Sequence, residues 1–174
     1  QPYIEGLYVR GIISGKGDGV FMPEERITRE EFVKLVVELF GLNDPNAQAE
    51  FSDVDPNAWY YSYVATAAAK NIVSGIGDGQ FGVGQNIKRQ DMAKIIQSVL
   101  LSQGVEGTPA TADVFADYET ISEYARDSVL TVYQLGIVSG DDNRNFNPNQ
   151  FATRQEAAKM IYGMMTVYLQ NAGQ

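Results

Sequence analysis

The chain has 174 residues, 44% of them hydrophobic, which suits one or two domains with a buried core. It contains neither cysteine nor histidine, which excludes disulfides, thiolate nucleophiles, histidine bases and the usual zinc sites. The net charge of −9 argues against a nucleic-acid partner, because phosphates demand a basic surface. No run of 18 apolar residues occurs, so no membrane insertion is expected.

One pattern of glycine, phenylalanine and arginine occurs three times. Each copy has a glycine that ends an Ile-x-Ser-Gly turn, a phenylalanine six residues later and an arginine eight residues after that. The glycines are Gly15, Gly75 and Gly140, and the arginines are Arg29, Arg89 and Arg154. This fixed register indicates a repeat protein, a class that usually presents binding surfaces rather than catalysing reactions.

The first repeat, residues 1–42, is expected to be truncated at its N-terminus. Only the tail of its first helix, residues 3–10, precedes the turn, and the chain starts at Gln1 without a signal-peptide pattern, which indicates a fragment or a mature form. A second helix is predicted from Arg29, because apolar residues recur at helical spacing after it. Thr28 and Glu31 match a capping box at its start.

The second repeat, residues 50–104, opens with Phe51-x-Asp53, which the first repeat lacks. A helix is predicted over about residues 58–71, and a tight turn at residues 77–79, where single acids between glycines fit a calcium loop poorly. The next helix starts at Arg89 with the same apolar offsets. Its start differs, because Lys88 takes the place of the capping threonine and Asp91 is the acid.

The third repeat, residues 113–174, has a helix predicted over about residues 124–135 and another from Arg154, with a capping box at Thr153 and Glu156. Each unit is therefore expected to be helix, glycine-rich loop, helix, which gives an all-α fold. The glycine of each Ile-x-Ser-Gly turn ends the first helix or follows it directly, which predicts a left-handed backbone conformation there.

An arginine in the first turn of a helix is disfavoured by the helix dipole. Two explanations are open. The arginine fork can bind a carboxylate or phosphate from outside, or it can form an internal ion pair with Asp53, Asp117 or a neighbouring acid. No acid pair stands out as a glycosidase pair, although Glu30, Glu31 and Asp53 are carboxylates of the required kind. The sequence therefore predicts no enzyme, no catalytic residue, no cofactor and no metal site.

Taken together, the motifs resemble three tandem surface-layer homology (SLH) repeats over nearly the whole chain. The resemblance rests on a few segments that recur in order at fixed spacing. They are Phe51-x-Asp53-Val54, Trp59, the Ile-Val-Ser-Gly turn, Gly77-Asp78-Gly79-x-Phe81 and Ile-Thr-Arg-Glu-Glu. The resemblance implies one SLH unit, in which three helix-loop-helix repeats surround a central three-helix bundle in a pseudo-threefold arrangement, with grooves between adjacent repeats.

The same resemblance implies a function outside the cell. It is the non-covalent anchoring of a bacterial cell-surface protein to the cell wall or S-layer, through a secondary cell-wall polymer that often bears pyruvate ketals, or through a peptidoglycan-linked glycan. The alternative is a structural module that binds protein partners or associates with itself through the truncated repeat.

By position, the resemblance assigns ligand contacts to residues of all three repeats. Arg29, Arg89 and Arg154 are expected to bind a ligand carboxylate, and Gly15, Gly75 and Gly140 to let a sugar approach the backbone. Asp53 and Asp117 are expected to accept sugar hydroxyls or to hold an arginine, and Trp59 to serve both the core and the ligand. Because the three copies differ, their grooves are expected to be unequal.

Overall fold

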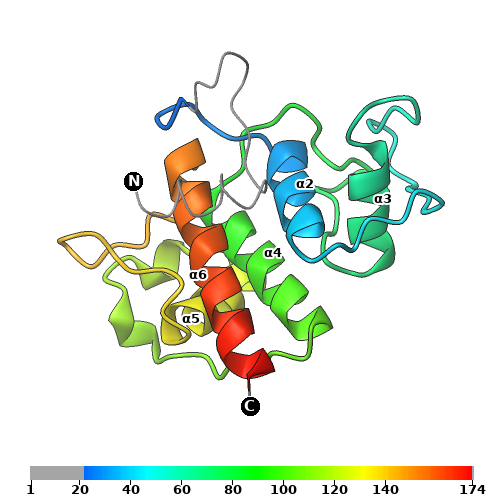
Figure 1. Ribbon diagram of the computed structural model, residues 1–174. Helices are drawn as coiled ribbons and strands as arrows, with labels where there is room; N and C mark the ends of the chain where they lie inside the picture. The colour runs from blue at the N-terminus through cyan, green and yellow to red at the C-terminus, as the bar shows by residue number, and fades with distance from the viewer. Residues whose placement is uncertain (1–21, 174) are drawn as a thin grey trace.

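A computed structural model describes residues 22–173, which are helical (Figure 1). The α-helices of this range are α2 (Arg29–Leu39), α3 (Tyr61–Ala69), α4 (Arg89–Ser102), α5 (Arg126–Gln134) and α6 (Arg154–Ala172). Short 3-10 turns, η1 (Ala112–Val114), η2 (Tyr118–Thr120) and η3 (Glu123–Ala125), precede α5. Residues 22–173 contain isolated β-bridges but no β-strand, so the predicted all-α class is confirmed. The expected helix tail at residues 3–10 and Gly15 lie outside the described residues.

The helix starts follow the sequence prediction. α2, α4 and α6 each begin at the repeated arginine. Thr28 with Glu31, and Thr153 with Glu156, form complete capping boxes. Lys88 has the same extended backbone as the two threonines but makes no side-chain cap. α3 and α5 occupy the two segments predicted to be helical before the Ile-Val-Ser-Gly turns.

α4 lies between α2 and α6 (Figure 1) and packs against both. The apolar residues that recur 3, 6, 7, 10 and 11 positions after each arginine form one stripe, which is fully buried in α4 and in α6. In α2 the stripe is rotated, since Val33 and Val37 are buried while Leu35 and Leu39 are only partly so.

A ring of backbone hydrogen bonds joins the residues that stand two positions before the arginines. The N–H of Ile27 donates to the carbonyl oxygen of Ala152 at 3.1 Å, Ala152 donates to Ile87 at 2.9 Å, and Ile87 donates to Ile27 at 3.0 Å. All three side chains are buried. The ring satisfies backbone groups that a helical fold would otherwise bury without partners, and it joins three distant segments.

The backbone N–H groups of the three arginines, two residues further along the chain, make a second set of links between the repeats. Arg29 donates to the carbonyl oxygen of Gln85 at 2.9 Å, Arg89 to that of Gln150 at 3.0 Å, and Arg154 to that of Glu25 at 2.7 Å. Each acceptor stands four residues before the arginine of another repeat. Each helix start is therefore tied to the loop that enters the next helix.

The glycines of the Ile-Val-Ser-Gly turns differ from the prediction. Gly75 and Gly140 are not left-handed; the left-handed residues are Asn71 (φ 55°) and Gly136 (φ 73°), four positions earlier. Glycine is instead required for space, since a Cβ on Gly75 would lie 2.2 Å from the carbonyl oxygen of Gln80. The predicted tight turn is present, with Gly77, Asp78 and Gly79 all at positive φ.

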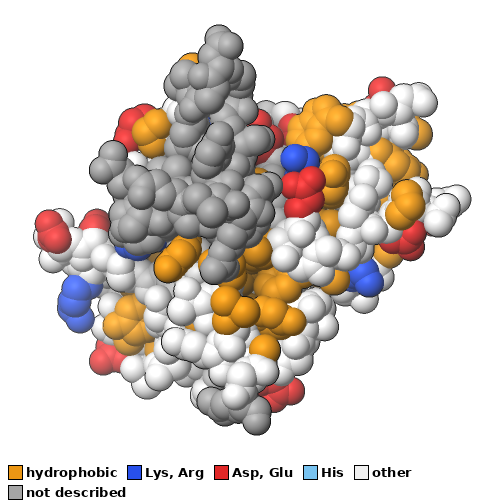
Figure 2. Space-filling model, viewed as in Figure 1, with side chains coloured by type: hydrophobic (Ala, Val, Ile, Leu, Met, Phe, Trp, Pro, Cys, Tyr) orange, Lys and Arg blue, Asp and Glu red, His pale blue; other side chains and the backbone are white. Residues whose placement is uncertain are grey.

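The face of the molecule in Figure 2 carries scattered charged side chains, and apolar side chains gather over its middle. Leu101 near the end of α4 and Leu169 in α6 are each about half exposed. Of the helices in residues 22–173, even the 19-residue α6 lacks the apolar length that a bilayer-spanning helix requires.

Candidate functional site: a cavity between the repeats

A cavity of about 590 Å³ lies between α2, α4 and the third repeat. All three repeats contribute to its wall. Arg29 comes from the first repeat, residues 72–77 and the start of α4 from the second, and Tyr124 and Phe151 from the third. The cavity therefore exists only when the three segments are assembled.

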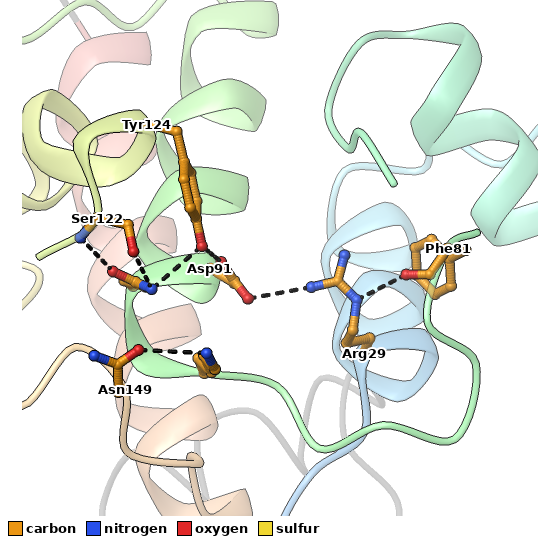
Figure 3. Close-up of polar contacts among 8 residues, drawn as sticks. Arg29, Phe81, Asp91, Ser122, Tyr124 and Asn149 are labelled. Carbon is orange, nitrogen blue, oxygen red and sulfur yellow. Dashed lines mark hydrogen bonds and ion pairs between the residues drawn. The ribbon is translucent and has the colours of Figure 1, made fainter. Parts of the chain in front are cut away.

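Arg29, at the start of α2, is held by internal contacts (Figure 3). Its Nε donates to the carbonyl oxygen of Phe81 at 2.9 Å, and its Nη1 lies 3.3 Å from Oδ2 of Asp91. The guanidinium also lies over the Phe81 ring, 5.1 Å from its centre. Burial lowers the pKa of Arg29 from its ordinary value, and the Asp91 carboxylate opposes that shift. The guanidinium stays charged at every physiological pH.

Arg89 makes the same contacts one repeat later. Its Nε donates to the carbonyl oxygen of Phe146 at 2.9 Å, its Nη1 to Glu156 at 2.8 Å, and it lies 5.1 Å from the centre of the Phe146 ring. For these two arginines the internal ion pair left open by the sequence exists, with an acid in the first turn of the following core helix. The corresponding phenylalanine for Arg154, Phe21, lies outside the described residues.

Asp53 and Asp117 bind backbone amides. The carboxylate of Asp53 accepts from the N–H groups of Phe81, Gly82 and Val83 at 2.7–2.9 Å. Asp117 accepts from Phe146 and Asn147, both at 2.7 Å. Burial tends to raise the pKa of Asp53, but the three amide donors outweigh it and hold the pKa below its usual value.

Each aspartate thus holds an arginine indirectly. Asp53 binds the N–H of Phe81, and the carbonyl of the same residue accepts from Arg29. Holding an arginine is one of the two roles that the resemblance implies for Asp53 and Asp117. Contact of Asp53 or Asp117 with sugar hydroxyls stays a prediction.

Asp91 and Tyr124 form a bridge across the wall of the cavity (Figure 3). The Tyr124 hydroxyl donates to Oδ1 of Asp91 at 2.6 Å and accepts from Nε2 of Gln90 at 3.2 Å. Burial and the hydrogen bond to Asp91 raise the pKa of Tyr124 to about 12. In the capping boxes of α2 and α6 the equivalent glutamates reach back to the cap N–H, whereas Asp91 uses its second oxygen for Tyr124.

Trp59 is 56% exposed and packs edge-on against Tyr60, with ring centres 5.4 Å apart. It does not line this cavity; Tyr124 does. Both aromatics stand 16 residues before the glycine of their turn, so Tyr124 is the third-repeat counterpart of Trp59. Gly75 lines the cavity beside Ile76, and a Cβ on Gly140 would lie 3.1 Å from backbone atoms of Arg144, closer than ordinary van der Waals contact.

The ligand contacts predicted from the sequence do not include the two lysines of the cavity wall, Lys88 and Lys94. The sequence predicts that Lys88 loses a cap and adds a charge that alters or strengthens the groove of the second repeat, but it does not single out Lys88 as a ligand contact. Lys94 carried a signal, because a lysine stands five residues after each of the three arginines. Lys94 lies outside the apolar stripe of α4, and a lysine on the polar side of a helix is usually only a solvated residue.

The carboxylates considered for catalysis have structural partners in the described part of the chain. Glu30 accepts from the N–H of Gly84, and Glu31 belongs to its capping box. Within residues 22–173, no group of three or more acidic side chains lies close enough to hold a metal ion.

Comparison with known proteins agrees with the repeat pattern. The S-layer homology domain family matches residues 1–33, 50–93 and 114–158. Similar proteins include an amylopullulanase of Thermoanaerobacterium thermosulfurigenes, 35% identical over 95% of this chain and 9% of that protein. An exoglucanase of Acetivibrio thermocellus is 33% identical over 95% of this chain and 15% of that protein.

An S-layer protein of Bacillus anthracis is 30% identical over 91% of this chain and 18% of its own length. The chain thus spans less than a fifth of each of these relatives, and it matches proteins with different catalytic names as well as S-layer proteins. What these proteins share with the chain is the repeated segment rather than one activity. The chain belongs to the S-layer homology domain family, of which it carries three repeats.

Proposed function

We propose that this chain anchors a larger bacterial protein non-covalently to the cell wall by holding a secondary cell-wall polymer between its repeats. The observation that carries the proposal is the cavity of about 590 Å³, whose wall combines three cations with the exposed side chains of Ile76, Tyr124 and Phe151. Such a wall suits an acidic glycan, because sugars present apolar faces as well as hydroxyls and anionic groups.

Membership of the S-layer homology family and the S-layer relatives support a place at the bacterial cell surface. The relatives with enzyme names match this chain over a small share of their length. The proposed role is therefore that of a non-catalytic anchoring module attached to different partners.

The proposed architecture has residues 1–42, 50–104 and 113–174 as three repeats of one unit. They are related by a pseudo-threefold axis that runs through the bundle of α2, α4 and α6. The two backbone rings support this arrangement, since each links equivalent positions of all three repeats, although the donor-to-acceptor order of one ring is the reverse of the other. An arrangement of this kind creates three grooves with equivalent walls but different side chains.

The proposed ligand is a glycan that carries pyruvate ketals. A ketal of this kind presents a carboxylate, for which arginine is a suitable receptor. Arg29, Arg89 and Arg154 are the proposed carboxylate contacts of the three grooves, and Gly15, Gly75 and Gly140 the proposed sites of close sugar approach. The internal acids of Arg29 and Arg89 mean that a ligand carboxylate must displace Asp91 or Glu156, or use the remaining N–H groups of the fork.

A pull-down with purified cell-wall sacculi tests the proposal. The protein is expected to sediment with native sacculi and to stay in solution when the secondary polymer has been extracted. Retention on the extracted sacculi would overturn the polymer as ligand. Release of sugar fragments by the purified chain, abolished by substitution of one carboxylate, would overturn the non-catalytic role.

The same preparation tests self-association through the first repeat, the competing function. Light scattering after size exclusion is expected to show a monomer that binds the polymer. A dimer that binds no polymer would favour the assembly role instead.

A further inference from the structure

The charges on the cavity wall are unevenly compensated. The wall carries three cations, Arg29, Lys88 and Lys94, against one carboxylate, Asp91, a net charge of +2 in a chain of net charge −9. The Asp91 carboxylate forms an ion pair with Arg29, in which Oδ2 lies 3.3 Å from Nη1. The cavity is therefore a local positive region on an acidic protein, and its unbalanced charge belongs to the two lysines.

Both lysines have neutral neighbours among the described residues. The Nζ of Lys88 lies 3.3 Å from the side-chain carbonyl oxygen of Asn149 (Figure 3), and the Nζ of Lys94 lies over the Tyr124 ring, 5.1 Å from its centre. Neither contact cancels a charge. In α2, by contrast, Lys34 at the position of Lys94 is paired with Glu38 at 3.3 Å.

The other wall groups are held in place. Arg29 is fixed by the Phe81 carbonyl and Asp91, and Tyr124 by Asp91 and Gln90. To use Arg29, an incoming anion must compete with a carboxylate that is already positioned and partly desolvated. To use the lysines, it needs to displace only an amide oxygen and water, which costs less.

We propose that in this cavity Lys88 and Lys94 supply the anion contacts, which replaces the contact proposed above for Arg29, and that the hydrogen-bonded Arg29–Asp91–Tyr124 bridge is the wall against which the sugar lies. The inference rests on the proposed function and refines it by naming the residues that bind the carboxylate of the acidic glycan. Lys88 replaces the threonine of the other two repeats, so this anion contact is peculiar to the second repeat.

The test measures the affinity of the monomeric protein for purified pyruvylated wall glycan, and for the same glycan after mild acid has removed its ketals. Lys88→Thr and Lys94→Gln are each expected to weaken binding to the native glycan about tenfold, the effect of losing one charge-assisted contact. Both are expected to bind the ketal-free glycan as the parent does. Lys70→Gln, at an exposed lysine outside the cavity, is the control for the loss of one positive charge.

The double variant Arg29→Gln/Asp91→Asn replaces the internal ion pair by a neutral pair. Because it alters the wall against which the sugar lies but leaves both lysines, it is expected to weaken binding of the native and of the ketal-free glycan by the same factor. If this folded variant loses affinity for the native glycan but not for the ketal-free glycan, while the lysine variants behave like Lys70→Gln, Arg29 is the contact and the inference is overturned, although the proposed function stands. If the parent protein binds neither glycan, the proposed function itself fails.

Discussion

Arg89 donates an N–H to the backbone carbonyl oxygen of Phe146 and lies over the ring of the same residue, 5.1 Å from its centre. Arg29 contacts Phe81 in the same way. In both cases the arginine starts a core helix, and the phenylalanine follows the turn of the next repeat. The arginine is thereby a link between repeats, and its place at a helix N-terminus is compensated by a carbonyl, an aromatic face and an acid.

We predict that Arg89 and Glu156 are energetically coupled. In a double-mutant cycle with Arg89→Gln and Glu156→Gln, the coupling free energy is expected to be about 1 kcal/mol, because the pair is close but partly exposed. Glutamine at position 156 can still complete the capping box, so the cap is kept. Urea unfolding of the four proteins measures the coupling; additive effects would mean that the ion pair contributes nothing.

We predict that Asp53 makes the stability of the protein acid-sensitive. Its pKa is lowered in the folded state, so its contribution is present above the unfolded pKa of about 3.9 and is lost as the pH falls through the folded pKa. Asp53→Asn is expected to lower the free energy of unfolding by about 1–2 kcal/mol at pH 7, because the asparagine side chain has only one oxygen that can accept from the backbone amides. The difference is expected to be smaller below pH 4, where Asp53 of the parent becomes protonated. Asp78→Asn, in an exposed turn, is the control. Parallel stability curves for Asp53→Asn and the parent would contradict the assignment.

Local features of the fold could be predicted from the sequence. The helix starts at Arg29, Arg89 and Arg154 and the two capping boxes depend on residues within one turn of each other, and the structure confirms them. The partners of the arginines could not be predicted. Phe146 is 57 residues from Arg89, and only the assembly of the repeats brings them together.

Two residues show where the sequence reasoning was wrong or incomplete. Gly75 was correctly singled out, but for backbone conformation, whereas the actual constraint is the carbonyl of Gln80, a contact across the turn. The sequence predicts a lost cap and an added charge at Lys88. The place of that charge, on a cavity wall built by three repeats, depends on tertiary structure.

We predict that Gly75→Ala destabilises the fold. The new Cβ would lie 2.2 Å from the carbonyl oxygen of Gln80, so the turn must shift, at a cost of about 1–3 kcal/mol. Gly173→Ala is the matched control, since its Cβ would meet no atom closer than 3.6 Å. If Gly75→Ala unfolds in urea like the parent but binds wall polymer less well, the glycine serves ligand approach rather than packing.

We predict that protonated Tyr124 stabilises the folded protein and that this stabilisation is lost at high pH. Its pKa is about 12 in the folded state, against about 10 in the unfolded chain, so the folded form keeps a proton that the unfolded form has lost. The stabilisation by protonated Tyr124 is fully present below pH 10 and disappears as the pH rises to about 12. Tyr124→Phe is expected to remove that part of the pH dependence in urea unfolding between pH 9 and 12. Asp91→Asn is expected to lower the pKa of Tyr124, and an unchanged titration would contradict the bridge.

We predict that Lys88→Thr stabilises the protein while it weakens binding of acidic glycan. Lys88 has φ −78° and ψ 150°, close to the values of the capping residues Thr28 and Thr153, so a threonine hydroxyl there can accept from the N–H of Asp91. A new N-cap contributes about 0.5–1 kcal/mol, or roughly 1–4 °C in melting temperature for a chain of this size. Lys88→Ala removes the same charge from the helix N-terminus without adding a cap, so it separates the dipole effect from the hydrogen bond. Because the two expected effects of Lys88→Thr have opposite signs, loss of binding cannot be ascribed to unfolding. A Lys88→Thr variant no more stable than Lys88→Ala would show that the helix start in the second repeat cannot accept a cap.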